Sequence, residues 1–175
     1  MKRERTREHL TQKEVQKLLA AVKKEGLSRN PQRDHCLLFL MVRHGLRVSE
    51  ACQLKLSDID LERKTIYVHR LKKGKPAVHP IYNGGELKSL YEWLKVRNGI
   101  ASEYDNLFLS EQRTPLNRST VWLMLQKYHR INVLGSDNDK NRIGLQTFAE
   151  GMIANTSLRA FLGHPVAPVG SSSFR

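Results

Sequence analysis

Residues 43–52, RHGLRVSEAC, combine side chains and spacing that could bind an anion. Gly45 is expected to end one helix, and Arg47 lies just after it and directly before another helix. An arginine at such a junction can be held rigidly between two helices, with its planar guanidinium turned toward a phosphate or a carboxylate. On charge alone, the alternative is an ion pair between Arg47 and Glu50, three residues further along the chain.

The charge of the whole chain also favours an anionic partner. The 175 residues include 30 Lys and Arg against 17 Asp and Glu, which gives a formal net charge of +13. Basic residues are concentrated in residues 1–34, with 10 against 5 acidic residues, and in residues 71–100, with 6 against 2. Two basic zones and a pI near 10.0 are typical of proteins that bind nucleic acid.

Hydropathy and cysteine usage argue against several classes of protein. The longest apolar run, residues 36–42, has seven residues, whereas a membrane-spanning helix needs about 20. The charged residues 1–10 lack the apolar core of a secretory signal, so we expect a cytoplasmic protein. Cys36 and Cys52 lie within apolar stretches and lack the clustering of a zinc site, so we expect two buried, reduced thiols.

Apolar periodicity and capping residues predict the elements that position these groups. Thr11 and Glu14 form a capping box at the start of a first helix, which Gly26 ends. Further helices are predicted over residues 33–44, 49–54, 86–98 and 118–128, with short ones over 147–153 and 158–162. Alternating β-branched and aromatic residues predict a strand over 65–70, which pairs across the turn 72–75 with a strand over 77–82. Pro80 places the second strand at a sheet edge or beside an irregularity.

The predicted fold class is mixed α+β, mainly α-helical, with a small antiparallel β-sheet near residues 65–82 and 106–109. We expect a basic N-terminal arm over residues 1–10, one domain over 11–164 and a tail over 165–175. The sequence shows no internal repeat, and no second domain is predicted.

Several motifs occur together in the order seen in a known family. Residues 43–50 are followed by Asp58-Ile-Asp60, by a strand and Arg70-Leu-Lys-Lys-Gly74, and then by His79-Pro-Ile81. In this order and spacing they resemble the tyrosine recombinase, or phage integrase, family, most of all the small branch that contains the fimbrial phase-switch DNA invertases. The resemblance is gap-free over residues 11–100, weaker to residue 130 and patchy beyond, so that residues 131–164 are degenerate.

The resemblance implies the catalytic-domain fold of this family over residues 11–164 and a site-specific DNA strand-exchange activity. In the family, a tyrosine attacks the scissile phosphate and forms a 3′-phosphotyrosyl intermediate. Two arginines and a histidine hold the non-bridging oxygens, and a hairpin lysine protonates the leaving oxygen. No metal or other cofactor is implied. The implied partner is double-stranded DNA, bound by tetramers on paired sites, and the implied location is the cytoplasm, in association with the nucleoid.

Carried over by motif, the implied catalytic residues are Arg47, Lys72, Arg142 and His164. Arg47 matches the first catalytic arginine, and His164 matches the histidine of the family's Leu-Gly-His motif. Lys72 matches the hairpin lysine by its distance from His79-Pro80, although Lys73 and Lys75 lie in the same turn. The implied DNA-binding residues, which include the basic arm, are Arg43, Lys73, Lys75, His79, Arg3 and Arg5.

The second catalytic box departs from the family pattern, which is His-x-x-Arg before a helix. Counted from residues 154–156, Arg142 falls at the arginine and Asp139 at the histidine. Counted from residues 147–149, Leu145 falls at the arginine and Arg142 at the histidine. Neither register gives an intact box, and the alternative for Arg142 is a loop cation beside acidic residues.

The nucleophile departs further from the family. The family's tyrosine lies nine residues after the histidine of Leu-Gly-His, a position that Ser173 occupies here, followed by Phe174. The last tyrosine in the sequence is Tyr128, which we expect to be packed on its helix. Strand cleavage by this chain is therefore expected to be impaired or absent, and the altered C-terminal segment is expected to affect tetramer assembly. The alternative function is a catalytically inactive DNA-binding module that occupies recombination sites.

Overall fold

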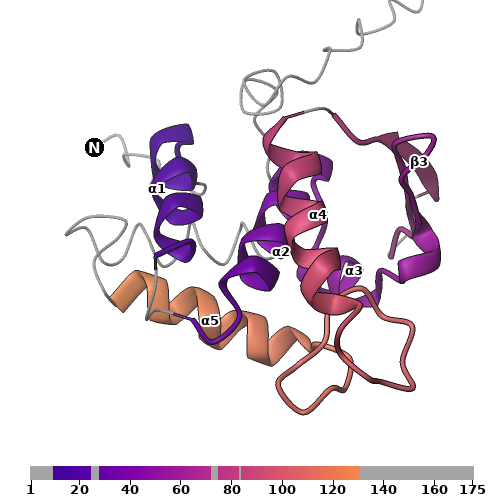
Figure 1. Ribbon diagram of the computed structural model, residues 1–175. Helices are drawn as coiled ribbons and strands as arrows, with labels where there is room; N and C mark the ends of the chain where they lie inside the picture. Colours follow the sequence, from indigo (N-terminus) through magenta and orange to yellow (C-terminus); the bar gives the residue numbers. More distant parts are fainter. Residues whose placement is uncertain (1–9, 25–27, 72–74, 83, 131–175) are drawn as a thin grey trace, which may run out of the picture.

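The computed structural model describes residues 10–24, 28–71, 75–82 and 84–130 (Figure 1). Within them, the elements follow in the order α1 (Gln12–Val22), α2 (Pro31–His44), α3 (Val48–Gln53), a 3₁₀ turn (Leu56–Asp58), β1 (Ile59–Asp60), β2 (Thr65–Val68), β3 (Ala77–Pro80), α4 (Gly85–Arg97) and α5 (Arg118–Arg130). The predicted fold class, mainly α-helical with a small antiparallel sheet, is confirmed. The helices predicted over 147–153 and 158–162 lie outside the described residues, as do the tail and nearly all of the arm.

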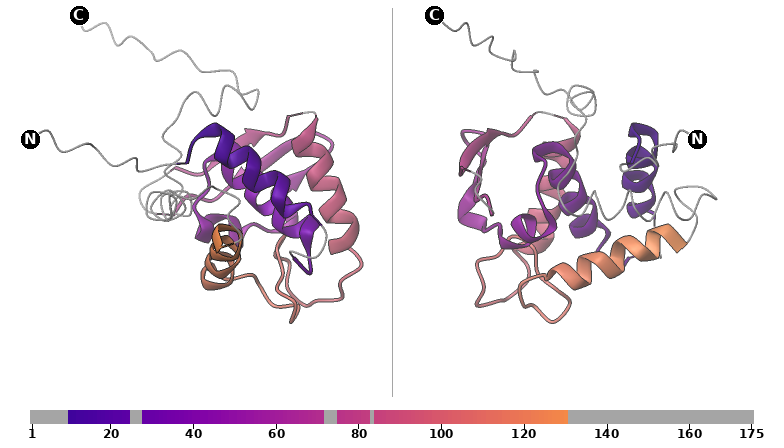
Figure 2. Two further views of the ribbon diagram at one scale, coloured as in Figure 1. Left: turned by 90° about the vertical axis from the view of Figure 1, so that its left-hand side faces the viewer. Right: turned by 180° about the vertical axis from the view of Figure 1, so that it is seen from behind.

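Helix α2 forms the centre of the fold. Its residues Leu37, Leu38 and Leu40 are all fully buried, as expected for a helix that is apolar on every side. It packs chiefly against α4 and also contacts α1 and α3, while α5 crosses below them and contacts α1 and α3 (Figures 1 and 2). Pro31 begins α2 at a position where its missing N–H removes no helical hydrogen bond. The elements that carry the site are therefore fixed to a helix with little access to solvent.

The sheet has the strand order β1-β2-β3, and both pairs are antiparallel. Ile66 of the central strand pairs with Ile59 of β1. Ile66 and Val68 face the core and are buried, whereas Tyr67 between them is exposed, which is the alternation that the sequence predicts. β3 is an edge strand, as Pro80 indicates, because proline cannot donate a ladder hydrogen bond.

The prediction that residues 106–109 belong to this sheet is wrong. The third strand is β1, and residues 106–109 instead make isolated bridges to Lys55 and Pro115. Residues 107–109 are buried in succession, so they wedge into the core rather than present alternate faces to core and solvent. These consecutive apolar residues therefore form a buried loop segment in the core and not a strand of the sheet.

Both cysteines lie in the core of the fold. Cys36 and Cys52 are free and buried, as predicted. Burial raises the pKa of both thiols, that of Cys52 to about 12, so neither is set up as a reactive thiolate. Among the described residues, no helix is both long enough and apolar enough to cross a membrane.

Candidate functional site

Arg47 lies in a tight turn between α2 and α3 whose shape depends on a glycine. Gly45 has φ 60° and ψ 42°, in the left-handed region that favours glycine, and it ends α2. The amide of Leu46 donates to the carbonyl of Met41 (3.1 Å), which locks the chain reversal. Arg47 is then extended, with φ −70° and ψ 153°, at the start of α3. The turn fixes Arg47 at the helix junction, as its spacing from Gly45 predicts.

Glu50 holds Arg47 from the first turn of α3. The Glu50 side chain is fully buried; its Oε1 accepts from Arg47 Nη1 (2.8 Å) and its Oε2 accepts from the Arg47 amide (3.0 Å). The Arg47 side chain nonetheless keeps 39% of its surface exposed. The ion pair with Glu50 and a rigidly held Arg47 are alternatives at the level of sequence, and the structure contains both.

The Glu50 carboxyl group stays ionised despite its burial. Burial alone would raise its pKa, but hydrogen bonds from Arg47, from the Leu71 amide and from Arg70 outweigh this effect and hold the pKa below its ordinary value. The negative charge opposite Arg47 is therefore permanent at neutral pH. It orients the guanidinium before any anion arrives, which lowers the entropy that binding has to remove.

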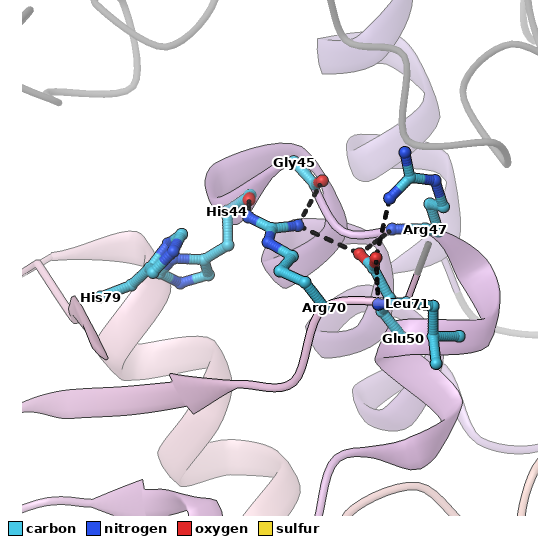
Figure 3. A network of polar contacts seen from close by, with 7 residues as sticks. All are labelled: His44, Gly45, Arg47, Glu50, Arg70, Leu71 and His79. Carbon is cyan, nitrogen blue, oxygen red and sulfur yellow. Dashed lines mark hydrogen bonds and ion pairs between the residues drawn. The ribbon is translucent and has the colours of Figure 1, made fainter. Parts of the chain in front are cut away.

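Arg70, which follows β2, completes the network around Glu50 (Figure 3). Its Nη1 donates to Glu50 Oε2 (3.0 Å) and to the carbonyl of Gly45 (3.0 Å). Its Nη2 donates to the carbonyl of His44 (2.9 Å). One guanidinium therefore contacts the end of α2 and the first turn of α3 together.

The backbone of Leu71 ties the connection between β2 and β3 to the same carboxylate. Its amide donates to Glu50 Oε1 (3.1 Å), and Lys72 is the next residue in the chain. From the sequence, Glu50 is predicted only as an ion-pair partner of Arg47, and Arg70 only as part of a motif. The sequence does contain a signal for Glu50. It stands three residues after Arg47, the N-cap residue of α3, and a side chain at that position can reach back to the N-cap amide.

A second polar cluster lies between α2 and α4, around Glu86. Its Oε1 is 2.6 Å from His44 Nε2, and its Oε2 accepts from Arg43 Nε (3.3 Å) and from the Tyr82 amide (3.1 Å). Arg43 Cζ lies 5.0 Å from the centre of the Tyr82 ring. Nδ1 of His44 is 3.3 Å from Nδ1 of His79 on β3. This cluster joins α2, α4 and β3 inside the fold.

The DNA-binding residues predicted from the sequence fall in different places. Lys75 is exposed, and His79 is half-buried beside His44. Arg43 is 5% exposed and ion-paired with Glu86, so a direct contact of Arg43 with DNA does not fit this placement, and we assign it to the packing of α2 on α4. The remaining predicted site residues lie outside the described residues: Arg3, Arg5, Lys72, Lys73, Arg142, His164, Ser173 and Phe174.

Tyr128 is packed in the core, as predicted. Its side chain on α5 is fully buried, and burial raises its pKa to about 12. A phenol in this position has no surface on which to meet a DNA phosphate. Tyr128 is therefore unsuited to act as a nucleophile.

The fold matches solved structures of recombinases. The XerA recombinase matches with a TM-score of 0.63 and 22% identity, over 85% of this chain and 50% of that chain. XerH, solved in a pre-cleavage complex with its difH substrate, matches with a TM-score of 0.61 and 23% identity, over 87% and 48%. A dimer of a lambda integrase fragment (75–356) bound to a COC′ core site matches with a TM-score of 0.56 and 20% identity, over 99% of this chain and 63% of that chain. The fold is that of the tyrosine recombinase catalytic domain.

Sequence comparison gives the family. The Phage integrase family matches residues 8–142, and the chain belongs to this family. Type 1 fimbriae regulatory protein FimB of Escherichia coli (strain K12) is 39% identical over 132 residues, which are 75% of this chain and 61% of FimB. Type 1 fimbriae regulatory protein FimE of the same strain is 34% identical over 122 residues, 69% of this chain and 60% of FimE. The predicted resemblance to the fimbrial branch is confirmed, and the chain spans less than two thirds of the length of either relative.

Proposed function

We propose that this chain binds double-stranded DNA, with Arg47 as a ligand of one backbone phosphate. The placement of Arg47 carries the proposal. Glu50 holds its amide and one guanidinium nitrogen (Figure 3), and 39% of the Arg47 side chain is exposed. Within the described part of the chain, no hydrogen bond engages Nε or Nη2 of Arg47. A guanidinium with donors left over can bind two phosphate oxygens in its own plane.

Membership of the phage integrase family supports DNA as the anion. The residues proposed as further DNA contacts are Lys73, Lys75 and His79 of the hairpin and Arg3 and Arg5 of the arm. Residues 11–164 are proposed to form the catalytic domain, residues 1–10 the arm and 165–175 the tail. A cytoplasmic location with the nucleoid is part of the same proposal, as is assembly into tetramers on paired sites provided that the altered C-terminal segment permits it.

The proposed reaction class is phosphoryl transfer between DNA strands. A nucleophilic oxygen would attack phosphorus, the bond to the 5′-oxygen would break, and Lys72 would give that oxygen its proton. Arg47, Arg142 and His164 would stabilise the charge on the non-bridging oxygens. The hydrogen bond from the Leu71 amide supports the assignment of Lys72, because it ties the preceding residue to the carboxylate that holds Arg47.

We propose that strand cleavage is impaired in this chain. Ser173 stands where the family has its tyrosine, and a serine hydroxyl needs an activating base to attack phosphorus. Tyr128 is buried and gives no substitute. The same observations favour a second candidate, a module that occupies recombination sites without cleaving them.

Replacing Arg47 by alanine tests the proposed phosphate contact. We expect R47A to weaken DNA binding about tenfold and to lower the slope of log K against log salt by about 1, because one counterion fewer is released. Fluorescence anisotropy of a labelled duplex carrying a pair of inverted repeats, titrated at several NaCl concentrations, measures both. The control is R29A, since Arg29 is another exposed arginine, 83%, and is ion-paired with Glu111. Wild-type affinity and slope in R47A would overturn the proposal.

A nicked duplex with the same repeats distinguishes impaired cleavage from retained cleavage. The chain is incubated with this DNA and the products are separated on denaturing and native gels. DNA retained on the native gel without a covalent band on the denaturing gel supports binding without cleavage. A covalent protein–DNA band would show that a side chain of this chain attacks phosphorus, and it would contradict the proposed impairment.

A further inference from the structure

Arg70 has no role in the proposed function, although it makes several contacts in the network around Glu50. Its side chain is 16% exposed, and its hydrogen bonds go to Glu50 and to the backbone carbonyls of His44 and Gly45. All three acceptors lie in the segment that carries Arg47. Arg70 therefore donates to the groups that hold Arg47, the proposed phosphate ligand, in place.

The two carbonyls are groups that need a donor. The last four carbonyls of an α-helix have no partner within the helix, and His44 and Gly45 lie buried at the C-terminal end of α2. A cation at this end also interacts favourably with the helix dipole. The planar fork of arginine reaches both carbonyls and the carboxylate at once, whereas a lysine ammonium is a single point of contact.

Glu50 transmits the position of Arg70 to Arg47. Its Oε2 accepts from Arg70 Nη1 and from the Arg47 amide, both at 3.0 Å. Its Oε1 accepts from Arg47 Nη1 (2.8 Å) and from the Leu71 amide (3.1 Å). These four donors occupy both oxygens, each of which has two lone pairs. The carboxylate cannot turn without breaking one of these bonds, so Arg70, Arg47 and the start of the β2–β3 connection hold one another in place.

We propose that Arg70 is a positioning residue for phosphate binding, which fixes the guanidinium of Arg47 through Glu50 and through the carbonyls at the end of α2. This inference rests on the proposed function, because it takes Arg47 to be a ligand of DNA. It differs from a direct phosphate contact by Arg70, in which Arg70 would act independently of Arg47. It also differs from a role in stability alone, in which any comparable loss of stability would have the same effect.

Variants of Arg70 with and without Arg47 test the coupling. R70K, R70Q and R47A, and the double variants of R47A with each, are made in the full chain. DNA affinity is measured by anisotropy at one salt concentration, and urea unfolding is measured in parallel. We expect R70K and R70Q each to weaken DNA binding about tenfold, because neither side chain has the planar set of donors that reaches both carbonyls and Glu50. Lysine keeps the positive charge, so R70K separates the loss of this geometry from the loss of charge. In the R47A background the loss should fall to less than about twofold, because Arg70 acts through Arg47.

Arg97 supplies the matched control for a purely structural effect. It is 4% exposed and, like Arg70, donates to backbone carbonyls, those of Asn106 (3.0 Å) and Tyr104 (2.7 Å). These acceptors follow α4 and are not part of the Glu50 network. We expect R97K to lower the urea midpoint while the folded protein keeps wild-type DNA affinity.

Each other outcome overturns the inference in a recognisable way. Wild-type affinity in R70K would mean that charge alone suffices. Losses that add fully in the double variants would make Arg70 an independent phosphate ligand, and would leave the role of Arg47 intact. An equal loss of affinity in R97K would reduce the role of Arg70 to stability. Wild-type affinity in R47A would instead overturn the proposed function itself, so the two failures can be told apart.

Discussion

Glu50 and Glu86 organise two polar clusters that are alike in construction and differ in what they leave at the surface. Each carboxylate has a side-chain exposure of 0% and accepts from an arginine and from a backbone amide. In each, burial alone would raise the pKa, and hydrogen bonds from the partners hold it below its ordinary value. The arginines differ, because the exposed fraction of the side chain is 39% for Arg47 and 6% for Arg43.

This difference separates a cluster built for packing from one suited to binding. Around Glu86, the cation of Arg43 is enclosed between α2 and α4, so opposite charges compensate inside the fold. Around Glu50, the anion is buried and the cation is partly exposed, so positive charge faces solvent from a fixed position. An arginine within a sequence motif is therefore informative about function only together with the exposure of its guanidinium.

Removal of Glu86 should have the largest effect on stability. The E86A variant leaves the buried cation of Arg43 without its anion, so we expect the free energy of unfolding to fall by about 3–5 kcal/mol. Urea unfolding followed by circular dichroism measures this change. The control is E92A on the same helix, where Glu92 has 39% side-chain exposure and long ion pairs of 3.9 and 4.0 Å. E92A should change stability by less than about 0.5 kcal/mol, and an E86A loss no larger than this would contradict the enclosed cluster.

His35 should make the free energy of unfolding depend on pH in a higher pH range than Glu50 and Glu86 do. Burial, reinforced by the charge of Lys23, lowers the pKa of His35 from 6.5 to about 4. The unfolded chain therefore binds a proton at His35 more readily than the folded chain does. The contribution of His35 to the free energy of unfolding is complete above pH 6.5 and falls by about 3 kcal/mol as the pH drops from 6.5 to 4. The pKa values of Glu50 and Glu86 are lowered, so their stabilisation is complete above their ordinary value of 4.5 and is lost below it.

Urea unfolding of wild type and H35N between pH 7 and pH 3 separates these contributions. Asparagine places a polar group where His35 Nδ1 lies 2.6 Å from Ser89 Oγ, and it has no proton to gain. H35N should show a flat stability from pH 6.5 to about 4.5 and the same acid loss below it. An unchanged slope between pH 6.5 and 4.5 would contradict the assignment to His35.

Replacing Glu50 or Glu86 by glutamine compares the two clusters directly. We expect each change to affect stability less than E86A does. We expect E50Q to lower the free energy of unfolding by about 2 kcal/mol, because charged hydrogen bonds become neutral ones. We also expect it to weaken DNA binding about tenfold, because the Arg47 guanidinium loses its fixed anion. E86Q should destabilise the fold and weaken DNA binding by the folded protein much less than E50Q does, because His44 stands between Glu86 and the proposed DNA contact His79. Equal effects of the two variants on DNA affinity would remove the distinction between the clusters.

The helices could be predicted because their signals are local. Thr11 forms the predicted capping box with Glu14. The side chain of Asn117 accepts from the Thr120 amide (2.8 Å) at the start of α5, a contact typical of an N-cap asparagine. β1 could not be predicted, because a strand of two residues has no periodicity to detect. Residues 107–109 suggested a strand because they are short and apolar, a pattern that a buried loop shares with a buried strand.

The site could be predicted where its contacts are close in sequence. Arg47 and Glu50 are three residues apart on one turn, so their ion pair follows from spacing. The contacts of Arg70 could not be predicted, because its partners lie 20, 25 and 26 residues away and two of them are backbone carbonyls. Arg43 shares the motif of Arg47, yet the packing of α2 against α4 places it inside. Sequence reports which cations are near the site, and the tertiary packing decides which of them face solvent.

The hydrogen bond from the Leu71 amide to Glu50 also makes that amide a reporter on site assembly. It joins the β2–β3 connection to a side chain of α3, so it does not depend on the ladder of the sheet. We expect exchange of this proton for deuterium to require only that Leu71 separate from Glu50, a local opening that leaves the α2–α4 core closed and needs less free energy than global unfolding. Its exchange rate therefore measures how often the site is assembled when no anion is bound.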